Sequence, residues 1–350
     1  MNSILIYSRD IGGTNLMVAA HQMIEAGAES VGDAVALIDF VSAHISELEN
    51  CQITVVAKDY AIRSWQRAGV KPIDISSVSK VDDISDVVQK LISDINPNVV
   101  LTATTDVDDR TDVMFWRKCR ELNVPVAALV DHRVNINARF FDKNSSAVYP
   151  DVIFVIDEHV RLQLLDNDVA PQKVQIIGDI HLSRLKSRKV DGSSQINAMH
   201  LREKWTVSSS DMVVLFVSEC LREMRMLGAG ATCYDEIDSL ENLLSQLRET
   251  ATLGNQMLNL NNLTLVIRPH PKDAEGKYAS YVSHRNINSN DLNIVVDNDS
   301  SAEIAIIASD IIVGMDSTML GEAQALGKPV YSNCQSDSVG NVNTVQWYRK

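Results

Sequence analysis

Two short segments near the end of the chain carry side chains suited to holding a nucleotide. The first reads Arg-Pro-His-Pro at 268–271 and directly follows an apolar, strand-like run. The second, at 311–322, begins as an apolar run and passes through Ser317 and Thr318 into a helical pattern that includes Glu322. Hydroxyls, a carboxylate and free backbone N–H groups at the carboxyl ends of strands suit a phosphate and a ribose. The sequence therefore predicts a nucleotide site in this part of the chain.

A helix that begins near Met319 would favour the binding of an anion at its N-terminus. Ser317 and Thr318 lie at its N-cap, where backbone N–H groups have no partner within the helix. A departing phosphate develops negative charge, which these N–H groups and a nearby cation would stabilise. His270 stands between two prolines, which restrict the backbone and direct the side chain.

Each of these residues also has a purely structural explanation. N-capping alone accounts for Ser317 and Thr318, and it is compatible with phosphate contact. His270 would then be an ordinary histidine at the end of a strand. Arg268 can add positive charge to the site or pair with a carboxylate at the domain surface. Glu322 would be a carboxylate near a helix N-terminus, worth roughly 0.3–1 kcal/mol.

A second polar group follows the first apolar run of the chain. Asp10 precedes Gly12 and Gly13, and the glycines allow a bound substrate to approach the backbone closely. The spacing lacks the full G-x-G-x-x-G pattern, so a dinucleotide site is not expected. A tight turn between a strand and a helix is the alternative explanation of the two glycines.

Candidates for acid–base chemistry also follow strand-like runs in the first half. Asp131 and His132 are adjacent, and a carboxylate beside an imidazole can accept a proton near neutral pH. These two are the favoured catalytic bases, with Asp10 next. Asp106 and, in the second half of the chain, Glu219 at the end of the run 212–217 are further candidates. The alternative for each is a hydrogen-bonded carboxylate or a core histidine.

The polar stretch after this pair is a candidate for substrate contact. It contains Asn135, Asn137 and Arg139. Amide and guanidinium groups form hydrogen bonds with sugar hydroxyls or with an anion.

Strand-like apolar runs alternate with helical patterns along the first half of the chain. The strand-like runs are Ser3–Ser8, Gln52–Ala57, Pro72–Ile75, Asn98–Thr104, Pro125–Val130, Asp151–Ile156 and Lys173–Ile177. Helices are predicted from Asp10 onward and over Ala61–Ala68, Ile84–Ile95, Asp112–Leu122 and Val160–Leu165. Near-continuous apolar strands separated by helices are typical of a parallel sheet covered on both faces.

The same alternation restarts after a polar stretch at 187–194, which is predicted to be a linker. The predicted strands are Met212–Val217, Leu263–Arg268, Leu292–Val296, Asp310–Val313 and Pro329–Ser332. The predicted helices are Asn197–Trp205, Ile237–Thr250, Ala302–Ala308 and Thr318–Leu326. We therefore expect an α/β fold of two doubly wound Rossmann-like domains, 1–186 and 187–350, facing a cleft.

Composition narrows the class of protein. Of the 350 residues, 45% are hydrophobic and 22% are charged, as in an ordinary soluble protein of about two domains. The net charge of −14 argues against broad binding to nucleic acid or to an anionic membrane. The scattered cysteines, the lack of a membrane-spanning apolar run and the lack of a signal peptide favour a cytoplasmic site. The histidines do not cluster, so no metal site is predicted.

The predicted architecture resembles that of the GT-B glycosyltransferases, a fold that UDP-N-acetylglucosamine 2-epimerases share. The Arg-Pro-His-Pro segment and the Ser317-Thr318 pair are similar to the His-Pro and Ser-Ser/Thr motifs of bacterial capsule enzymes, including polysialyltransferases. The architectural resemblance covers nearly the whole chain, and the motif resemblance covers about the last quarter. The acidic-acidic-glycine motif of polysialyltransferases is absent from the sequence, which leaves the donor sugar open.

The resemblance implies roles for several residues. The nucleotide-sugar site would consist of Arg268, His270, Ser317, Thr318 and Glu322 in the C-terminal domain, with Gly12 and Gly13 in the N-terminal, acceptor-side domain. Glu322, five residues before Gly327, matches a glutamate that accepts hydrogen bonds from both ribose hydroxyls in many GT-B enzymes. The resemblance also implies that no metal or other cofactor is needed, because helix dipoles and basic groups take that role.

Three functions are compatible with these residues. The main interpretation is a glycosyltransferase that moves a sugar from a nucleotide-activated donor to a cell-surface glycan, a glycolipid or a precursor. The alternatives are a sugar-nucleotide 2-epimerase, which needs no acceptor, and a non-catalytic protein that binds a nucleotide sugar. The sequence leaves open the donor, the acceptor, peripheral association with a membrane-bound assembly, and homo-oligomerisation.

Overall fold

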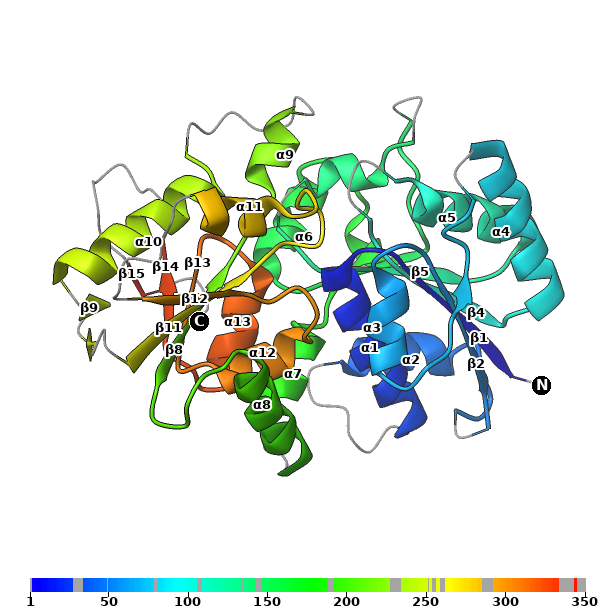
Figure 1. Cartoon of the computed structure of the whole chain (residues 1–350). Helices are drawn as coiled ribbons and strands as arrows, with labels where there is room; N and C mark the ends of the chain where they lie inside the picture. Colours follow the sequence, from blue (N-terminus) through cyan, green and yellow to red (C-terminus); the bar gives the residue numbers. More distant parts are fainter. Residues whose placement is uncertain are drawn as a thin grey trace. The chain divides into compact units, whose positions relative to one another are not determined.

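The computed structural model describes residues 2–27, 34–48, 50–78, 81–105, 109–133, 135–142, 146–187, 192–226, 234–250, 252–253, 256–258, 262–284, 292–333 and 343–344. The chain forms two compact units, Met1–Arg184 and Leu185–Lys350. The boundary between them falls within helix α7 (Ile180–Ser187). Each unit is built around its own sheet (Figure 1).

The sheet of unit 1 has seven parallel strands in the order β3-β2-β1-β4-β5-β6-β7. The strands are β1 (Ser3–Ser8), β2 (Gln52–Ala57), β3 (Ile73–Asp74), β4 (Val99–Ala103), β5 (Val126–Val130), β6 (Val152–Val155) and β7 (Val174–Ile176). The chain moves outward from β1 in one direction and then restarts beside β1 with β4. This is a doubly wound sheet, with its topological switch point between β1 and β4.

Helices cover both faces of this sheet, because alternate side chains of each strand point to opposite sides. The helices are α1 (Ile11–Glu25), α2 (Val35–Ser42), α3 (Ala61–Arg67), α4 (Val81–Ile95), α5 (Thr111–Leu122) and α6 (Glu158–Leu165), with short 3₁₀ turns η2 (Asn137–Phe140) and η3 (Pro171–Lys173). Ile4 and Ile6 of β1 belong to the core that includes α1, α2 and α3. Leu5 and Tyr7 belong to the opposite core, which includes α4, α5 and α6.

The sheet of unit 2 has six strands in the order β12-β11-β8-β13-β14-β15. They are β8 (Met212–Val217), β11 (Leu263–Arg268), β12 (Asn293–Val296), β13 (Ile311–Gly314), β14 (Val330–Ser332) and β15 (Asn343–Thr344). Only β15 pairs antiparallel within this sheet as described. A separate hairpin joins β9 (Thr252–Leu253) and β10 (Gln256–Met257). The first strand of the unit, β8, lies between β11 and β13, so this sheet is doubly wound as well.

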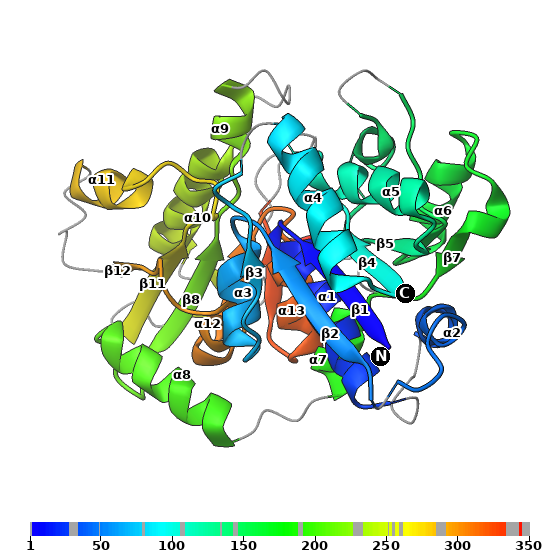
Figure 2. The ribbon, with the colours of Figure 1, turned by 90° about the vertical axis from the view of Figure 1, so that its right-hand side faces the viewer.

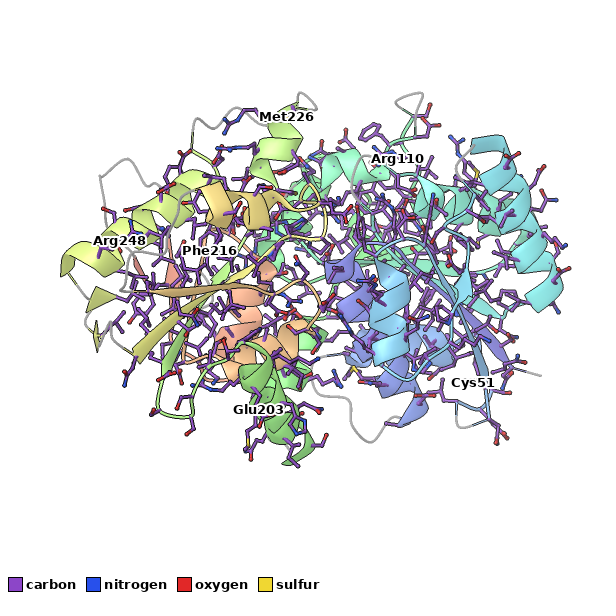
Figure 3. All side chains as sticks on the ribbon, viewed as in Figure 1. Cys51, Arg110, Glu203, Phe216, Met226 and Arg248 are labelled. Atoms are coloured by element: carbon purple, nitrogen blue, oxygen red, sulfur yellow. The ribbon has the colours of Figure 1, made fainter. Side chains whose placement is uncertain are left out.

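Helices again cover both faces of the second sheet (Figure 2). They are α8 (Gly192–Lys204), α9 (Leu221–Met226), α10 (Glu236–Thr250), α11 (Lys277–His284), α12 (Ala302–Ala308) and α13 (Thr318–Ala325). Val213 and Leu215 of β8 pack with α8, α12 and α13, whereas Val214 and Phe216 pack with α10 and α11. Phe216 is fully buried, while Met226 at the end of α9 is 80% exposed (Figure 3).

Local sequence signals explain where several helices begin and end. Asp157 caps α6 by accepting a hydrogen bond from the Val160 N–H, and Ser301 caps α12 in the same way. Asn123 adopts a left-handed conformation with φ of 55° and ends α5.

The prediction of an α/β fold with two doubly wound sheets is confirmed. Helices α2, α7, α9 and α11 were not predicted. The helix expected at Asn197–Trp205 begins earlier, at Gly192, so the predicted linker at 187–194 includes the last residue of α7 and the first turn of α8. The helices that were not predicted have six to eight residues, about two turns, which is too short for a helical period to be distinguished in the sequence.

Candidate functional site

The topological switch point of unit 2 lies between β8 and β13. Ser218 and Glu219 follow β8 directly, and Asp316 and Ser317 follow β13. In doubly wound folds, ligands bind at the carboxyl ends of the strands where the winding direction reverses. This edge of the sheet is therefore the first place to look for a ligand site in unit 2.

A glycine allows the elements at this edge to pack closely. A Cβ atom on Gly314, at the end of β13, would lie 3.1 Å from Leu320 Cδ2 and 3.2 Å from the Val217 carbonyl oxygen. The first turn of α13 and the end of β8 therefore come together around this residue. Ser317 caps α13, because its Oγ accepts a hydrogen bond of 3.3 Å from the Met319 N–H.

Glu219 is a carboxyl group poised to exchange a proton near neutral pH. One of its oxygens accepts a hydrogen bond from the backbone N–H of Asp316, immediately before α13. Burial raises the pKa of Glu219 to about 7; the hydrogen bond from Asp316 lowers it, and the negative charges of Asp316 and Glu236 raise it. The combination of a switch-point position and a carboxyl that titrates near 7 is typical of acid–base sites.

His270 presents a neutral imidazole at the end of β11. Its Nδ1 accepts a hydrogen bond of 3.1 Å from the Lys272 N–H, so the ring proton lies on Nε2. Burial lowers the pKa of His270 to about 4, and the positive charges of Lys272 and Lys277 act in the same direction. The backbone N–H of His270 donates to Asp273 at 2.7 Å, which fixes the Pro-His-Pro turn.

A buried lysine holds the loops around this edge together. The ammonium of Lys277 donates to Glu223 at 2.8 Å, to Asp273 at 2.7 Å and also to Glu236. Carboxylate oxygens of these three acids lie within 4.8 Å of one another, an arrangement that could otherwise hold a cation. Their charge is instead shared with Lys277, whose side chain is 10% exposed. Asp273 also accepts a hydrogen bond of 3.1 Å from Ser218, which links the cluster to the end of β8.

Two further residues of the predicted nucleotide site are Arg268 and Glu322. Arg268 donates to Asp297 at 3.1 Å and to the hydroxyl of Ser300 at 2.9 Å, which is the structural role considered as its alternative. The helix begins at Thr318 rather than Met319, so Glu322 lies in the second turn of α13. It is 5% exposed and sits on the same helix as the Ser317 cap.

The carboxyl edge of unit 1 brings together the two glycines and Asp131. Gly12 and Gly13 lie in the first turn of α1, and Asp10 is its N-cap residue. A Cβ on Gly12 would lie 2.3 Å from Asp131 Oδ2, and a Cβ on Gly13 would lie 2.7 Å from the Cβ of Ala103, at the end of β4. The glycines therefore allow α1 to press against β4 and the Asp131 carboxylate, which is the tight-turn role proposed as their alternative.

Asp131 is held by a buried arginine. Arg139, in η2, donates from Nη1 to Asp131 Oδ1 at 3.0 Å and to Thr104 Oγ1 at 3.0 Å. The side chains of Arg139 and Asp131 are 10% and 11% exposed. His132, the residue after Asp131, is partly exposed and follows the end of β5. Asp106, a further candidate for a base, lies outside the described residues.

A different carboxyl in unit 1 titrates near neutral pH but lies too deep to meet a substrate. Burial raises the pKa of Asp112 to about 7, and its side chain accepts a 2.8 Å hydrogen bond from the Thr105 N–H. The residue is fully buried, so its role is to hold the end of β4.

The sequence placed Glu219 at the end of a strand and kept it as a further candidate for a base. The structure adds that β8 and β13 are neighbours, so Glu219 lies beside the start of α13. The Lys277 cluster joins segments up to 54 positions apart and left no local signal.

No protein-family model matches the sequence, and no curated protein is significantly similar to it. Solved structures are similar in fold. A UDP-GlcNAc 2-epimerase from Neisseria meningitidis bound to UDP-GlcNAc has a TM-score of 0.63 and 13% identity, covering 94% of this chain and 82% of that one. The UDP-GlcNAc 2-epimerase of Methanocaldococcus jannaschii in complex with UDP-GlcNAc and UDP has a TM-score of 0.58 and 12% identity, covering 94% and 83%. Anabaena HepE in complex with UDP-glucose has a TM-score of 0.54 and 11% identity, covering 94% and 80%.

At this level of identity the likeness establishes the fold. The chain has the two-domain, Rossmann-like GT-B architecture. Within the described residues, no helix has both the length and the apolar character needed to cross a membrane.

Proposed function

We propose that this protein is an enzyme that acts on a nucleotide-activated sugar, and that it inverts the sugar at C2. Support comes from the fold shared with 2-epimerases whose structures contain UDP-GlcNAc or UDP, and from the polar groups at the edge of the second sheet. The sequence alone ranked glycosyl transfer first, and the similar structures favour the epimerase alternative instead.

The nucleotide would bind at the carboxyl edge of unit 2. The N-terminus of α13 supplies the Ser317 and Thr318 hydroxyls and the positive end of the helix dipole for the phosphates. His270 would donate from Nε2 as a neutral hydrogen-bond donor. Glu322, in the same helix, would accept hydrogen bonds from the ribose. Arg268 would act at longer range, because its guanidinium is already bound by Asp297.

Inversion at a carbon requires one group that removes its proton and another that returns a proton to the opposite face. Glu219 carries the proposal for one of these roles, because a carboxyl with a pKa of about 7 both gains and loses a proton readily at neutral pH. Its bond to the Asp316 N–H places it directly before the proposed phosphate site. Asp131, His132 and Asp10 remain the proposed proton acceptors of unit 1.

One observation carries this proposal: Glu219 stands at the switch point of the second sheet, beside the start of α13, with its carboxyl titrating near neutral pH. Burial alone raises the pKa of a carboxyl, as it does for the structural Asp112. The place of Glu219 at the switch point, bonded to the residue before α13, is what links its proton exchange to a ligand site.

Glycosyl transfer is the second candidate. The Arg-Pro-His-Pro segment and the Ser317-Thr318 pair favour it, through their similarity to motifs of bacterial capsule enzymes. The same nucleotide site would serve both reactions, so the acceptor decides between them.

The deciding experiment incubates the protein in D₂O with UDP-, CMP-, CDP- and GDP-sugars, with and without a glycan acceptor. A 2-epimerase changes the sugar without an acceptor and introduces deuterium at C2. A transferase releases nucleotide only when an acceptor is present. Binding without turnover would contradict both enzyme assignments and leave the non-catalytic alternative.

The ribose and proton-transfer assignments are tested by substitutions in unit 2. Glu322→Ala should weaken nucleotide binding by about 1–3 kcal/mol, since two hydrogen bonds to a carboxylate are lost. Glu219→Gln should lower turnover by about a hundredfold or more while nucleotide affinity stays within about twofold. Glu203→Gln, on the exposed surface of α8, is the matched control. Full turnover in Glu219→Gln would remove this residue from the mechanism.

The unit 1 assignments are tested separately. Asp131→Ala, His132→Ala and Asp10→Ala are measured one at a time for turnover and nucleotide affinity. A proton acceptor should lose about a hundredfold in turnover with affinity nearly unchanged. Three fully active variants would show that unit 1 supplies no base among these residues.

A further inference from the structure

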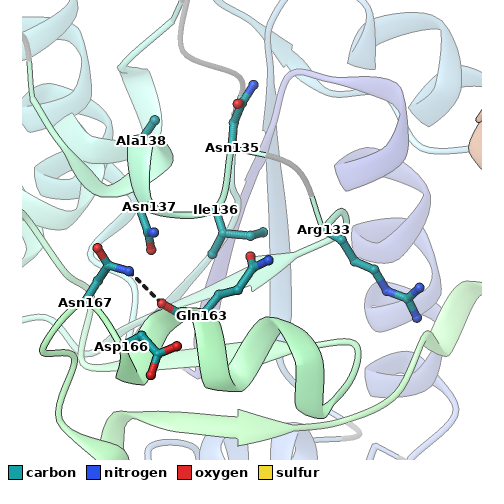
Figure 4. Close-up of a pocket in the computed structure, with 8 residues that line it drawn as sticks. All are labelled: Arg133, Asn135, Ile136, Asn137, Ala138, Gln163, Asp166 and Asn167. Atoms are coloured by element: carbon teal, nitrogen blue, oxygen red, sulfur yellow. Dashed lines mark hydrogen bonds between the residues drawn. The ribbon is translucent and has the colours of Figure 1, made fainter.

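Unit 1 contains a polar pocket that the proposed nucleotide site does not use. It lies between the segment that follows β5 and helix α6, and has a volume of about 460 Å³ (Figure 4). Its polar lining consists of Arg133, Asn135, Asn137, Gln163, Asp166 and Asn167. Pockets of this size hold small molecules, and four of the lining side chains are amides.

One lining residue needs a partner that the described protein does not supply. The side-chain oxygen of Asn137 is buried, and no hydrogen-bond donor within the described ranges reaches it. Figure 4 shows this side chain directed toward Asn167 and Gln163, on the other wall of the hollow. A buried acceptor without a donor is unfavourable, so an O–H or N–H group from a ligand or water belongs there.

The other lining groups define the charge of that ligand. The guanidinium of Arg133 is engaged by Asp157, with contacts of 2.7 Å from Nε and 2.6 Å from Nη2 to Oδ2. Asp166 adds a carboxylate to the lining. An anion would therefore meet one already paired cation and one like charge, which disfavours phosphate or carboxylate ligands.

The amides offer both acceptors and donors. The Asn167 Nδ2 donates to the Gln163 backbone oxygen at 2.8 Å, and the Gln163 Nε2 contacts His159 Nε2 at 2.9 Å. Their side-chain oxygens remain, together with that of Asn137, as acceptors along the hollow. A neutral ligand with several neighbouring O–H donors matches this set, and sugars carry such hydroxyls.

We propose that this pocket is a binding subsite for a neutral saccharide. It goes beyond the nucleotide site and does not depend on it. The 3₁₀ turn η2 contributes Asn137 to the pocket and, two residues later, Arg139 to the ion pair with Asp131. A sugar in the pocket would therefore rest on the turn that positions Asp131.

The test uses the full chain and titrates it with N-acetylglucosamine and with its β1,4-linked disaccharide, followed by saturation-transfer NMR. Inorganic phosphate serves as the anionic comparison. The sugars should bind and phosphate should not. Asn137→Leu should weaken sugar binding by at least about tenfold, because the side-chain oxygen that accepts a hydrogen bond from a sugar hydroxyl is lost. Asn197→Leu, exposed on α8 in unit 2, should leave the affinity unchanged.

Gln163→Leu provides a second variant, on the partly exposed side of α6, in case Asn137→Leu does not fold. It should also weaken binding, by about threefold or more. The proposal is overturned if neither sugar binds at a sugar concentration of about 50 mM, which would saturate a site with a millimolar Kd. It is also overturned if folded Asn137→Leu and Gln163→Leu bind the sugars as tightly as wild type.

Saturating UDP separates this subsite from the nucleotide site. Sugar binding that persists with UDP present supports the pocket, and competition by UDP would place the sugar in the nucleotide site and overturn the proposal. If UDP does not bind at all, the proposed function fails while the sugar titration still decides the pocket.

Discussion

The raised pKa of Glu219 predicts an unusual dependence of stability on pH. The ordinary pKa of 4.5 rises to about 7 in the folded protein because burial disfavours the charged form. A carboxyl whose folded pKa is raised binds a proton more tightly in the native state than in the unfolded chain. Its contribution to stability is therefore largest below pH 4.5 and is lost as pH rises toward and through 7.

The magnitude follows from the size of the shift. One pKa unit corresponds to about 1.4 kcal/mol, so a shift from 4.5 to about 7 is worth about 3 kcal/mol over the whole range. Most of this change, about 2 kcal/mol, falls between pH 5 and pH 8. Glu219→Gln keeps an oxygen that can accept from the Asp316 N–H and abolishes the titration. The variant should match wild type within about 1 kcal/mol at pH 5 and exceed it by about 2 kcal/mol at pH 8.

Urea unfolding at pH 5, 6.5 and 8, followed by hydrogen exchange of the β8 and β13 amides, measures this effect in unit 2 alone. Following those amides matters because a chain of two units need not unfold in one step. Glu203→Gln is the control, since its side chain is exposed on α8 and should show no such difference. An equal stability difference between Glu219→Gln and wild type at pH 5 and pH 8 would refute the assigned burial of this carboxyl.

Three further substitutions test the contacts around the two sheet edges. Gly12→Ala should destabilise unit 1 by about 1–3 kcal/mol in urea unfolding, because its Cβ would lie 2.3 Å from Asp131 Oδ2; Gly192→Ala, with open space around it, is the control. Lys277→Met should destabilise unit 2 by about 3–5 kcal/mol, since three carboxylates lose their shared cation, and Lys277→Arg should recover part of that loss. The folded pKa of His270 is depressed, so wild-type unit 2 should lose stability as pH falls from 6.5 to about 4. The His270→Asn variant should lose less stability over that range. Equal loss in thermal melts of the two proteins would contradict the burial of His270.

Local sequence was enough to predict the class of fold. Apolar β-branched runs alternating with helical patterns predicted nearly all the longer strands and both doubly wound sheets. These signals are local, because the hydrophobic period of a strand or a helix depends on residues close together in the sequence. The position of Ser317 at a helix N-cap was predictable for the same reason. The roles assigned to Asp131, His132, Asp10, His270 and Glu322 remain predictions.

The tertiary structure alone decided the properties that depend on residues far apart in the sequence but close in space. Glu219 acquires its pKa from burial and from Asp316, 97 positions away in the chain. Arg268, the last residue of β11, binds Asp297 across 29 positions, which is one of the two roles that the sequence left open for it. Burial and charge pairing arise only when segments far apart in sequence come together, so composition and spacing alone could not determine the protonation state of these residues.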